Sequence, residues 1–472
     1  MKSYPPETAY FCLFLVSLWL VGTIFEELAR CRLLGELLVG MLFGNLGVGT
    51  LLPSDKTAII LCGEIGILAI IFDAGMATEL GRIRKAALRG TLIAVFGTVV
   101  PVATGFGFVY ALLKTNALPG ASIRETGSIV VEALASGAAL GSTSIACAVS
   151  LMKNKGLLET PVGTLITTAA MIDDVISLVL LGIVASIGAS KSDSGTTTDI
   201  GAMTVLQPIL ASLGIIFVGL LGCTTIAKFV ARRTRNQAVE LQDFAEVALE
   251  GGARNGHKDL NTECGDSGAR REQVAGGYIK KQARLFHRAF APSIKLAAMV
   301  LVGIGYSILA EYLGSSRLLG AFVAGVFFSP LTSFTQVYKE QVTDILLPAL
   351  SAVFFATIGF AIPLTKIFSP ILFGWGFLYA VIASLSKLIT CLLVPISNKS
   401  VSRAVDDQRP RAKERWLVGT AMIARGELGL LMVQQALLQG VLSEAAMVVT
   451  TWSIILCTLV GVSALSFVMR TR

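Results

Sequence analysis

The sequence predicts an all-α, multi-pass membrane protein of about 13 transmembrane helices, arranged as an inverted-topology repeat with two broken crossover helices. The chain has 472 residues, of which 54% are hydrophobic and only 15% are charged, whereas soluble domains carry about 25% charged residues. Its apolar runs are long enough to cross a bilayer as helices. The runs also repeat along the chain, and two of them contain glycine and polar residues near their midpoints.

Thirteen apolar segments of membrane length follow one another along the chain. They occupy residues 9–29, 33–52, 57–78, 90–113, 128–152, 161–188, 204–230, 293–312, 317–335, 344–362, 370–397, 415–438 and 444–468. Pro348 makes the tenth segment the weakest of these helices. The polar segment 231–292 has the glycines and mixed charges of a cytoplasmic linker, and its basic residues are also typical of a regulatory or lipid-contacting segment.

An odd number of spans places the two termini on opposite sides of the membrane. With the N-terminus outside, the inside connections carry 30 Lys and Arg residues and the outside connections carry 7. Without the 13 basic residues that lie between Lys228 and Lys295, the ratio is still 17 to 7. The positive-inside rule therefore predicts a cytoplasmic C-terminus in an integral protein of the plasma membrane or an organelle membrane.

The two halves of the chain share a motif. Residues 32–44 (RLLGELLVGMLFG) and 317–329 (RLLGAFVAGVFFS) are identical at six of thirteen positions, at an offset of 285. The same offset relates helix 1 to helix 8, helix 5 to helix 12 and helix 6 to helix 13. Because the two copies of the motif enter the membrane from opposite sides, the sequence predicts an inverted repeat, the architecture of many secondary transporters.

Helices 5 and 12 are the two that the sequence predicts to be broken. Helix 5 carries small and hydroxylated residues from Ser136 to Ser144, and helix 12 carries the segment 424–429 (ARGELG). Unwound backbone at membrane depth is tolerated only where it is buried in protein or lines a cavity. Thr143 and Ser144 are thus candidate ion ligands or, alternatively, small residues for close helix packing, and we favour packing for Ser136 and Gly137.

Asp173 and Asp174 stand side by side near the middle of an apolar span. A carboxylate at that depth costs about 2.5–3.5 kcal/mol on insertion scales, so two adjacent ones indicate a site for a cation or a proton. Neighbours on a helix point about 100° apart and therefore meet different partners. Burial and a neighbouring carboxylate both favour the protonated form of a carboxyl group, so protons and cations are expected to compete here. A purely structural pair is the alternative.

Lys387 is another charge deep in an apolar span, and a buried ammonium needs a carboxylate partner. We predict an Asp173–Lys387 ion pair that breaks when the cation binds, with a static pair as the alternative. Arg425 and Glu427, in the break of helix 12, are read as mainly structural polar residues of the core that compensate helix dipoles. Glu64 is predicted to be a third structural polar residue of the core, and a pairing of Arg425 and Glu427 with Glu64 or Glu132 is also open.

The segments that carry a family resemblance are GELLVGMLFGNLGVG, GEIGILAIIFDAGMATEL, ALGSTSIACAV, TAAMIDDVISLVLL, SLSKL and MIARGELGLL. Together they resemble the monovalent cation/proton antiporters, in the branch with a paired Asp-Asp that includes bacterial sodium/proton exchangers and potassium-efflux transporters. The resemblance implies a homodimer and a core that moves against a dimerisation scaffold. It also implies that Asp174 is the main ion and proton carrier, that Asp173 pairs with Lys387, and that Thr143 lies near the ion. In this family the paired aspartate accompanies charge-moving exchange.

The resemblance divides the chain into six parts. They are 1–86 (helices 1–3, scaffold), 87–190 (helices 4–6, ion-binding core with crossover helix 5), 191–230 (linker helix 7), 231–292 (cytoplasmic polar loop), 293–366 (helices 8–10, scaffold) and 367–472 (helices 11–13, core with crossover helix 12).

The expected function is electrogenic sodium (or lithium)/proton antiport by alternating access, with the sodium or lithium ion on Asp174, Asp173, Thr143 and Ser144. Potassium/proton antiport on the same scaffold and, less favoured, a cation channel are the alternatives. An intramembrane aspartyl protease is disfavoured because its two carboxylates face each other, usually from different helices. We expect no enzymatic activity and no cofactor besides the transported cation and protons. The expected partners are membrane lipid and a second copy of the chain, with no nucleic acid.

Overall fold

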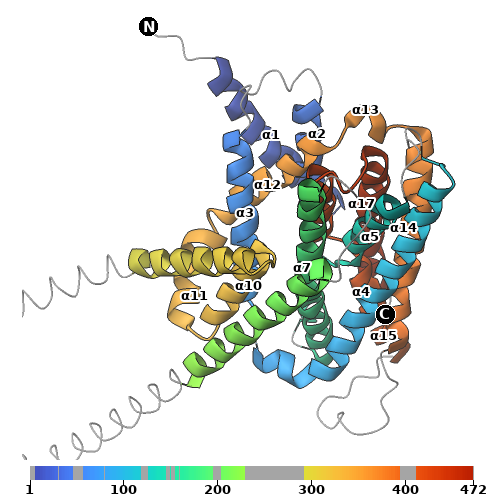
Figure 1. Cartoon of the computed structure of the whole chain (residues 1–472). Helices are drawn as coiled ribbons and strands as arrows, with labels where there is room; N and C mark the ends of the chain where they lie inside the picture. Colours follow the sequence, from blue (N-terminus) through green and yellow to red (C-terminus); the bar gives the residue numbers. More distant parts are fainter. Residues whose placement is uncertain are drawn as a thin grey trace, which may run out of the picture.

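The computed structural model of the chain (Figure 1) describes residues 6–29, 31–45, 57–78, 80–118, 126–144, 149, 152, 155–158, 160–194, 203–228, 292–393 and 411–470. Within these ranges the regular structure is helical throughout and contains no strand. The predicted loop 231–292 lies outside the described residues, apart from its last residue. The prediction of an all-α membrane fold is therefore confirmed for the described part of the chain.

The helices follow the predicted segments closely. In the first half they are α1 (Pro6–Ala29), α2 (Arg32–Asn45), α3 (Thr57–Met76), α4 (Leu80–Lys114), α5 (Thr126–Gly141) and α7 (Pro161–Ser194), followed by the helix Met203–Lys228. In the second half they are the helix Pro292–Tyr312, α10 (Arg317–Phe328), α11 (Thr332–Tyr338), the π-helix Lys339–Thr343, α12 (Leu347–Ala361), α13 (Leu364–Ile367), α14 (Pro370–Leu388) with a 3₁₀ turn Ile389–Leu393, α15 (Arg411–Ile423), α16 (Glu427–Leu438) and α17 (Glu444–Arg470).

The predicted total of thirteen spans is not confirmed. Every predicted segment contains a helix, but among the described residues nine helices are long and apolar enough to cross a membrane, or ten with one bent pair. The bent pair is Thr332–Thr343 with Leu347–Ala361, at 59°. Pro348 lies in the first turn of α12, where a proline is tolerated because its missing N–H has no helical partner. It therefore starts a helix in the tenth segment instead of interrupting one.

The repeat is visible in how pairs of helices touch. A Cβ on Gly40 of α2 would lie 2.2 Å from the Ala356 carbonyl oxygen of α12, and one on Gly325 of α10 would lie 2.2 Å from the Phe72 carbonyl oxygen of α3. Only glycine allows backbones to approach so closely. Gly40 and Gly325 are related by the 285-residue offset. The α2–α12 and α10–α3 pairs are thus equivalent contacts in the two halves of the repeat.

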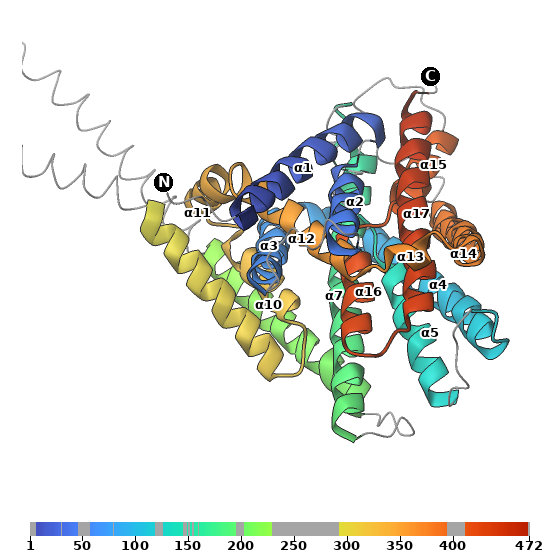
Figure 2. The same ribbon diagram turned by 90° about the horizontal axis from the view of Figure 1, so that it is seen from above.

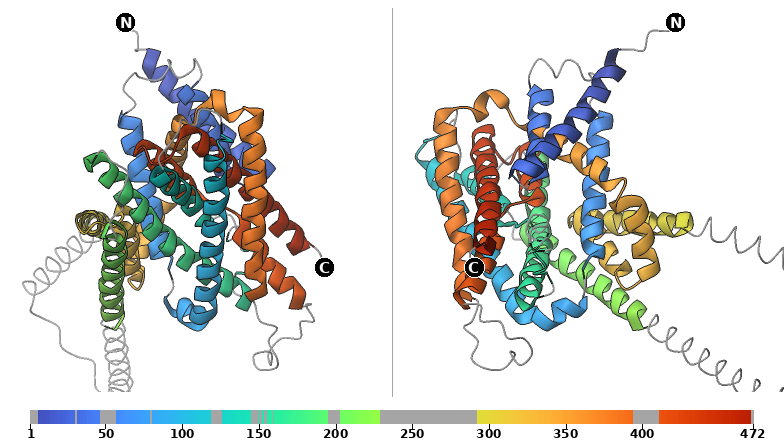
Figure 3. Two further views of the ribbon diagram at one scale, coloured as in Figure 1. Left: turned by 45° about the vertical axis from the view of Figure 1, so that its right-hand side comes forward. Right: turned by 180° about the vertical axis from the view of Figure 1, so that it is seen from behind.

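The helices gather into two groups (Figures 2 and 3). One contains α1, α2, α3, α10 and α12, with the helices Met203–Lys228 and Pro292–Tyr312 beside it. The other contains α4, α5 and α14–α17. Helix α7 packs mainly against α4 and also touches α5, α15, α16 and α10. It thus brings the double aspartate to the interior of the second group, close to the first.

Candidate ion-binding site

The two broken helices cross at their breaks. Helix α5 ends at Gly141 and residues 142–144 are not helical; α15 ends at Ile423 and α16 starts at Glu427, with residues 424–426 non-helical between them. The Ser144 N–H donates to the Ala424 carbonyl at 2.8 Å. The predicted breaks are therefore both present, and this bond pairs one freed N–H with one freed carbonyl, as burial at membrane depth requires.

A glycine permits this crossing. A Cβ on Gly426 would lie 2.7 Å from Cβ and 2.9 Å from Cα of Ser144. These distances are shorter than real Cβ atoms show, so a side chain at position 426 would push the two extended segments apart. Ser144 itself is buried and makes a hydrogen-bonding contact with the carboxylate of Glu427, the first residue of α16.

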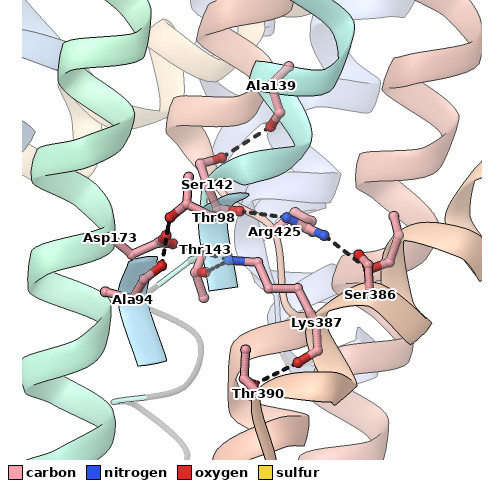
Figure 4. Close-up of polar contacts among 11 residues, drawn as sticks. Ala94, Thr98, Ala139, Ser142, Thr143, Asp173, Ser386, Lys387, Thr390 and Arg425 are labelled. Carbon is pink, nitrogen blue, oxygen red and sulfur yellow. Dashed lines mark hydrogen bonds and ion pairs between the residues drawn. The ribbon is translucent and has the colours of Figure 1, made fainter. Parts of the chain in front are cut away.

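Asp173 points from α7 toward the crossing and has both of its oxygens engaged (Figure 4). The Thr98 hydroxyl of α4 donates to Oδ1, and Lys387 Nζ donates to Oδ2 at 3.3 Å. Both side chains of the Asp173–Lys387 pair are 0% exposed. The ion pair that the sequence predicted is therefore present in the structure.

Lys387 joins α14 to the first broken helix. Its Nζ also donates to Thr143 Oγ1 at 2.6 Å, in the non-helical segment after α5 (Figure 4). The hydroxyl of Thr390, in the turn that follows α14, donates to the Lys387 carbonyl. Thr143, Asp173 and Lys387, which the sequence singled out from three distant segments, thus form one hydrogen-bonded cluster.

Asp174 has a different environment from its neighbour. Its side chain is partly exposed, and within the described part of the chain no hydrogen bond or ion pair holds it. The charges that act on it most strongly are the carboxylates of Glu427 and Asp173, and after them the ammonium of Lys387. Asp173 therefore has a partner on each oxygen, whereas Asp174 is hydrogen-bonded to none of the described residues.

Arg425 is fully buried in the break between α15 and α16. It donates to the carbonyls of Ser142 at 3.3 Å and Ala383 at 3.2 Å, while its Nε has no partner in the structure. The Ser142 carbonyl lies just beyond the C-terminal end of α5, where the helix dipole places partial negative charge. The predicted structural role of Arg425 as a dipole compensator fits these contacts.

The pairing of this arginine with Glu64 or Glu132 is not what the structure shows. Glu64 has an exposed side chain on α3, so its predicted place among the polar residues of the core differs from its position in the structure. Glu132 is buried and accepts hydrogen bonds from the N–H and hydroxyl of Ser443, just before α17. Sequence depth does not reveal which side of a helix faces the core, which explains Glu64; Glu132 does face the core but lies against Ser443.

The packing role favoured for Ser136 and Gly137 agrees with their contacts. A Cβ on Gly137 would lie 2.6 Å from the Val102 carbonyl oxygen, so α4 and α5 are in backbone contact there. Ser136 Oγ lies 2.6 Å from Thr450 Oγ1 and 3.3 Å from the Tyr379 hydroxyl. This hydroxyl cluster ties α5, α14 and α17 together.

Sequence reasoning missed Thr98. It is 1% exposed on α4, and its hydroxyl lies 2.9 Å from the Ala94 carbonyl as well as against Asp173. The sequence did contain a signal for Thr98, because Gly97 and Pro101 on either side of it interrupt an apolar run.

No cluster of three or more His, Cys, Asp or Glu residues that is able to hold a metal ion occurs among the described residues.

The site combines a carboxylate pair, a partnered lysine and two crossed helix breaks. Comparisons with known proteins give the family of the chain. A family model described as the transmembrane sodium/hydrogen exchanger matches residues 13–249 and 273–471. The chain belongs to this family. It is thereby a member of the monovalent cation/proton antiporter superfamily and an integral, multi-pass membrane protein.

Two curated relatives and one solved structure extend the comparison. A Na(+)/H(+) antiporter of Enterococcus hirae is 24% identical over 424 residues, covering 90% of this chain and 88% of that protein. The Na(+)/H(+)-K(+) antiporter GerN of Bacillus cereus is 21% identical over 462 residues, covering 98% and 95%. The sodium proton antiporter MjNhaP1 from Methanocaldococcus jannaschii, at 16% identity, matches with a TM-score of 0.59 over 98% of this chain and 96% of that one. This last likeness shows that the exchanger fold is shared.

Proposed function

We propose that this family member is an electrogenic sodium (or lithium)/proton antiporter that works by alternating access, with Asp174 as the carrier of cation and proton. The observation that carries the proposal is the unequal environment of the two aspartates. Asp173 is bound by Thr98 and Lys387, whereas Asp174 is partly exposed and has free oxygens. A cation can therefore bind Asp174 without first displacing a hydrogen-bond partner.

The balance of charge supports competition between a cation and protons. In their ionised forms, the carboxylates of Asp173, Asp174 and Glu427 outnumber the cations of Lys387 and Arg425 by one. An uncompensated charge is costly in a buried site, so the cluster favours one further positive charge. A monovalent cation and a proton both meet this need, and each excludes the other from the same oxygens.

The remaining ligands come from the first crossover. The Thr143 hydroxyl contacts Lys387 and the Ser144 hydroxyl contacts Glu427, so both lie among the charged residues of the site, and hard cations prefer such oxygen donors. Broken helices at a repeat interface are where secondary transporters bind their ions. Transfer of one net charge per cycle couples exchange to the membrane potential by ~2.3 kcal/mol per 100 mV.

The proposal is tested on purified protein in proteoliposomes with an imposed pH gradient and a pH-sensitive dye. Addition of sodium or lithium dissipates the gradient with wild-type protein and with Asp344→Asn, a control that changes an exposed aspartate outside the site. Asp174→Asn abolishes the response. Currents recorded on a supported membrane show net charge movement if exchange is electrogenic. Wild-type exchange by Asp174→Asn would refute the assignment of the carrier.

Potassium/proton exchange is the second candidate, favoured by the name of the Bacillus cereus relative, which includes both ions. Adding potassium to the same vesicles ranks the three cations and decides between the candidates. A channel predicts currents that follow the cation gradient without proton movement. The proposal also includes a homodimer in the lipid bilayer, which crosslinking of the reconstituted protein tests directly.

A further inference from the structure

The buried ion pair at the centre of the site is loosely joined. Lys387 Nζ lies 3.3 Å from Asp173 Oδ2, although both side chains are 0% exposed. Hydrogen bonds between an ammonium and a carboxylate are ordinarily about 2.7–2.9 Å long. A pair removed from water gains most from close contact because the local dielectric is low. Asp173 and Lys387 must therefore each have another hydrogen-bond partner that competes with the ion pair.

A threonine binds each member of the pair. Thr98 donates to the Asp173 oxygen that Lys387 does not use, so the carboxylate offers the ammonium one oxygen instead of two. On the other side, Lys387 donates to Thr143 at 2.6 Å, a much shorter contact than the one to Asp173. The two threonines come from α4 and from the break of the first crossover helix, and Figure 4 shows Thr98 beside Asp173 and Thr143 beside the Lys387 ammonium.

The residues around Thr98 in α4 allow its hydroxyl to reach Asp173. Pro101 has no N–H, so the carbonyl four residues earlier, on Gly97, lacks its helical partner. Gly97 also lies beside the lysine, because a Cβ there would be in ordinary contact with Lys387 Nζ at 3.8 Å. The methyl group of Thr98 packs next to Gly141, at 3.0 Å from the Cβ that an alanine would carry. The threonine is thus held in place by its methyl group while its hydroxyl faces Asp173.

We propose that Thr98 is a positioning residue that keeps the Asp173–Lys387 ion pair weak enough for a transported cation to break. This inference rests on the proposed function. When the pair opens, Asp173 keeps the hydrogen bond from Thr98 and Lys387 keeps its bond to Thr143, so neither charge is left buried without a partner. Leaving such a charge unpaired is the main cost of breaking a buried ion pair.

Removal of the Thr98 hydroxyl has a defined consequence. Oδ1 of Asp173 then becomes a buried acceptor without a donor, a state that is costly. The carboxylate relieves it by turning both oxygens toward Lys387, which makes the pair bidentate and tighter. A cation must then compete with a stronger pair. The cation concentration for half-maximal exchange is expected to rise about tenfold, with the maximal rate changed by less than about twofold.

The test compares Thr98→Val, which keeps the shape and removes the hydroxyl, with Thr98→Ser, which keeps the hydroxyl and removes the methyl group. Thr104→Val is the matched control, because this threonine lies on the same helix and its hydroxyl, among the described residues, contacts only the carbonyls of Val100 and Pro101 in its own helix. Sodium-driven exchange in proteoliposomes gives the half-saturating concentration and the maximal rate. If Thr98→Val does not fold, Thr98→Ala takes its place. If it folds but does not transport, the sodium-dependent rise in the unfolding temperature of the purified protein gives the same comparison of sodium affinity.

The inference predicts a raised half-saturating sodium concentration in Thr98→Val, a value near wild type in Thr98→Ser, and no change in Thr104→Val. An unchanged value in Thr98→Val would overturn it. Equal impairment of the Ser and Val variants would also overturn it, by assigning the role to the methyl group on Gly141. Failure of the proposed function looks different, since wild-type protein would then show no cation-driven exchange at all.

Discussion

Substitution of Gly426 by alanine tests the crossing of the two broken helices. The new Cβ would lie 2.7 Å from Ser144 Cβ and 2.9 Å from its Cα, so the segments must separate by about 0.7 Å to reach the ordinary contact distance of 3.4 Å. Overpacking of this kind costs about 1–3 kcal/mol. The strained or lost hydrogen bond from Ser144 N–H to the Ala424 carbonyl adds about 0.5–1.5 kcal/mol. The expected destabilisation is therefore about 2–4 kcal/mol.

The exchange rate is also expected to fall, and by more than the loss of folded protein alone would cause. Ser144 lies between the crossing and Glu427, and Thr143 next to it holds Lys387, so the separation displaces two groups of the site. Displacements of about 1 Å at reacting groups reduce rates by as much as about 100-fold. We expect exchange by Gly426→Ala to fall at least about tenfold, measured in proteoliposomes together with the unfolding temperature of the purified protein.

Gly374→Ala is the matched control for this substitution. Gly374 lies within α14 with nothing within 4 Å of an added Cβ, and alanine is a better helix former than glycine by about 1 kcal/mol. This variant is expected to be as active as wild type and at least as stable. Wild-type exchange and an unchanged unfolding temperature in Gly426→Ala would refute the close crossing of the two segments.

Three further substitutions test other parts of the core. Lys387→Met leaves Asp173 buried without its cation and is expected to destabilise the folded protein by about 3–5 kcal/mol. The double variant Asp173→Asn/Lys387→Met is expected to recover most of this loss in a thermal unfolding assay. Equal losses of stability in the two variants would contradict a buried ion pair. Glu132→Ala removes the acceptor for the Ser443 N–H and hydroxyl before α17 and is expected to cost about 1–2 kcal/mol, as loss of a helix cap does, while Glu132→Gln keeps a side-chain carbonyl and loses less. Tyr379→Phe gives up one long hydrogen bond of 3.3 Å to Ser136 and is expected to cost less than about 1 kcal/mol, because its ring still stacks on Phe108 with centroids 4.9 Å apart; a loss as large as that of Tyr379→Ala would show that the hydroxyl matters more than the ring.

The helices could be predicted because a bilayer imposes a simple rule. Each span needs about 20 apolar residues, and every segment found by that rule contains a helix in the structure. The number of spans could not be predicted in the same way. Length and hydropathy do not reveal that the tenth segment joins a π-helix through a 59° bend, or that α10 stops after 12 residues. These features depend on packing between helices.

The site could be predicted in part because buried charges are costly. Asp173 and Lys387 stood out as charges in apolar segments, and each needed the other. Glu64 stood out in the same way but has an exposed side chain on α3. Thr98 did not stand out, since a threonine in an apolar helix commonly donates to its own backbone, as Thr104 of the same helix does. Only orientation toward Asp173 separates the two threonines, and orientation comes from the tertiary structure.

Irregular backbone is the more general signal for this site. Three spans that meet at the site lose helical hydrogen bonds there: α5 ends at Gly141, α15 and α16 are separated at 424–426, and α4 contains Pro101, which has no N–H. Each irregularity leaves backbone polar groups that lipid cannot satisfy, so all three must face protein or a polar cavity. They are therefore driven to one place, and the charged residues of α7 and α14 meet them there. On this argument, helix breaks and prolines within apolar runs identify the walls of the site, including the α4 wall that carries Thr98, whereas a search for charges finds Asp173, Asp174, Lys387, Arg425 and Glu427 but not that wall.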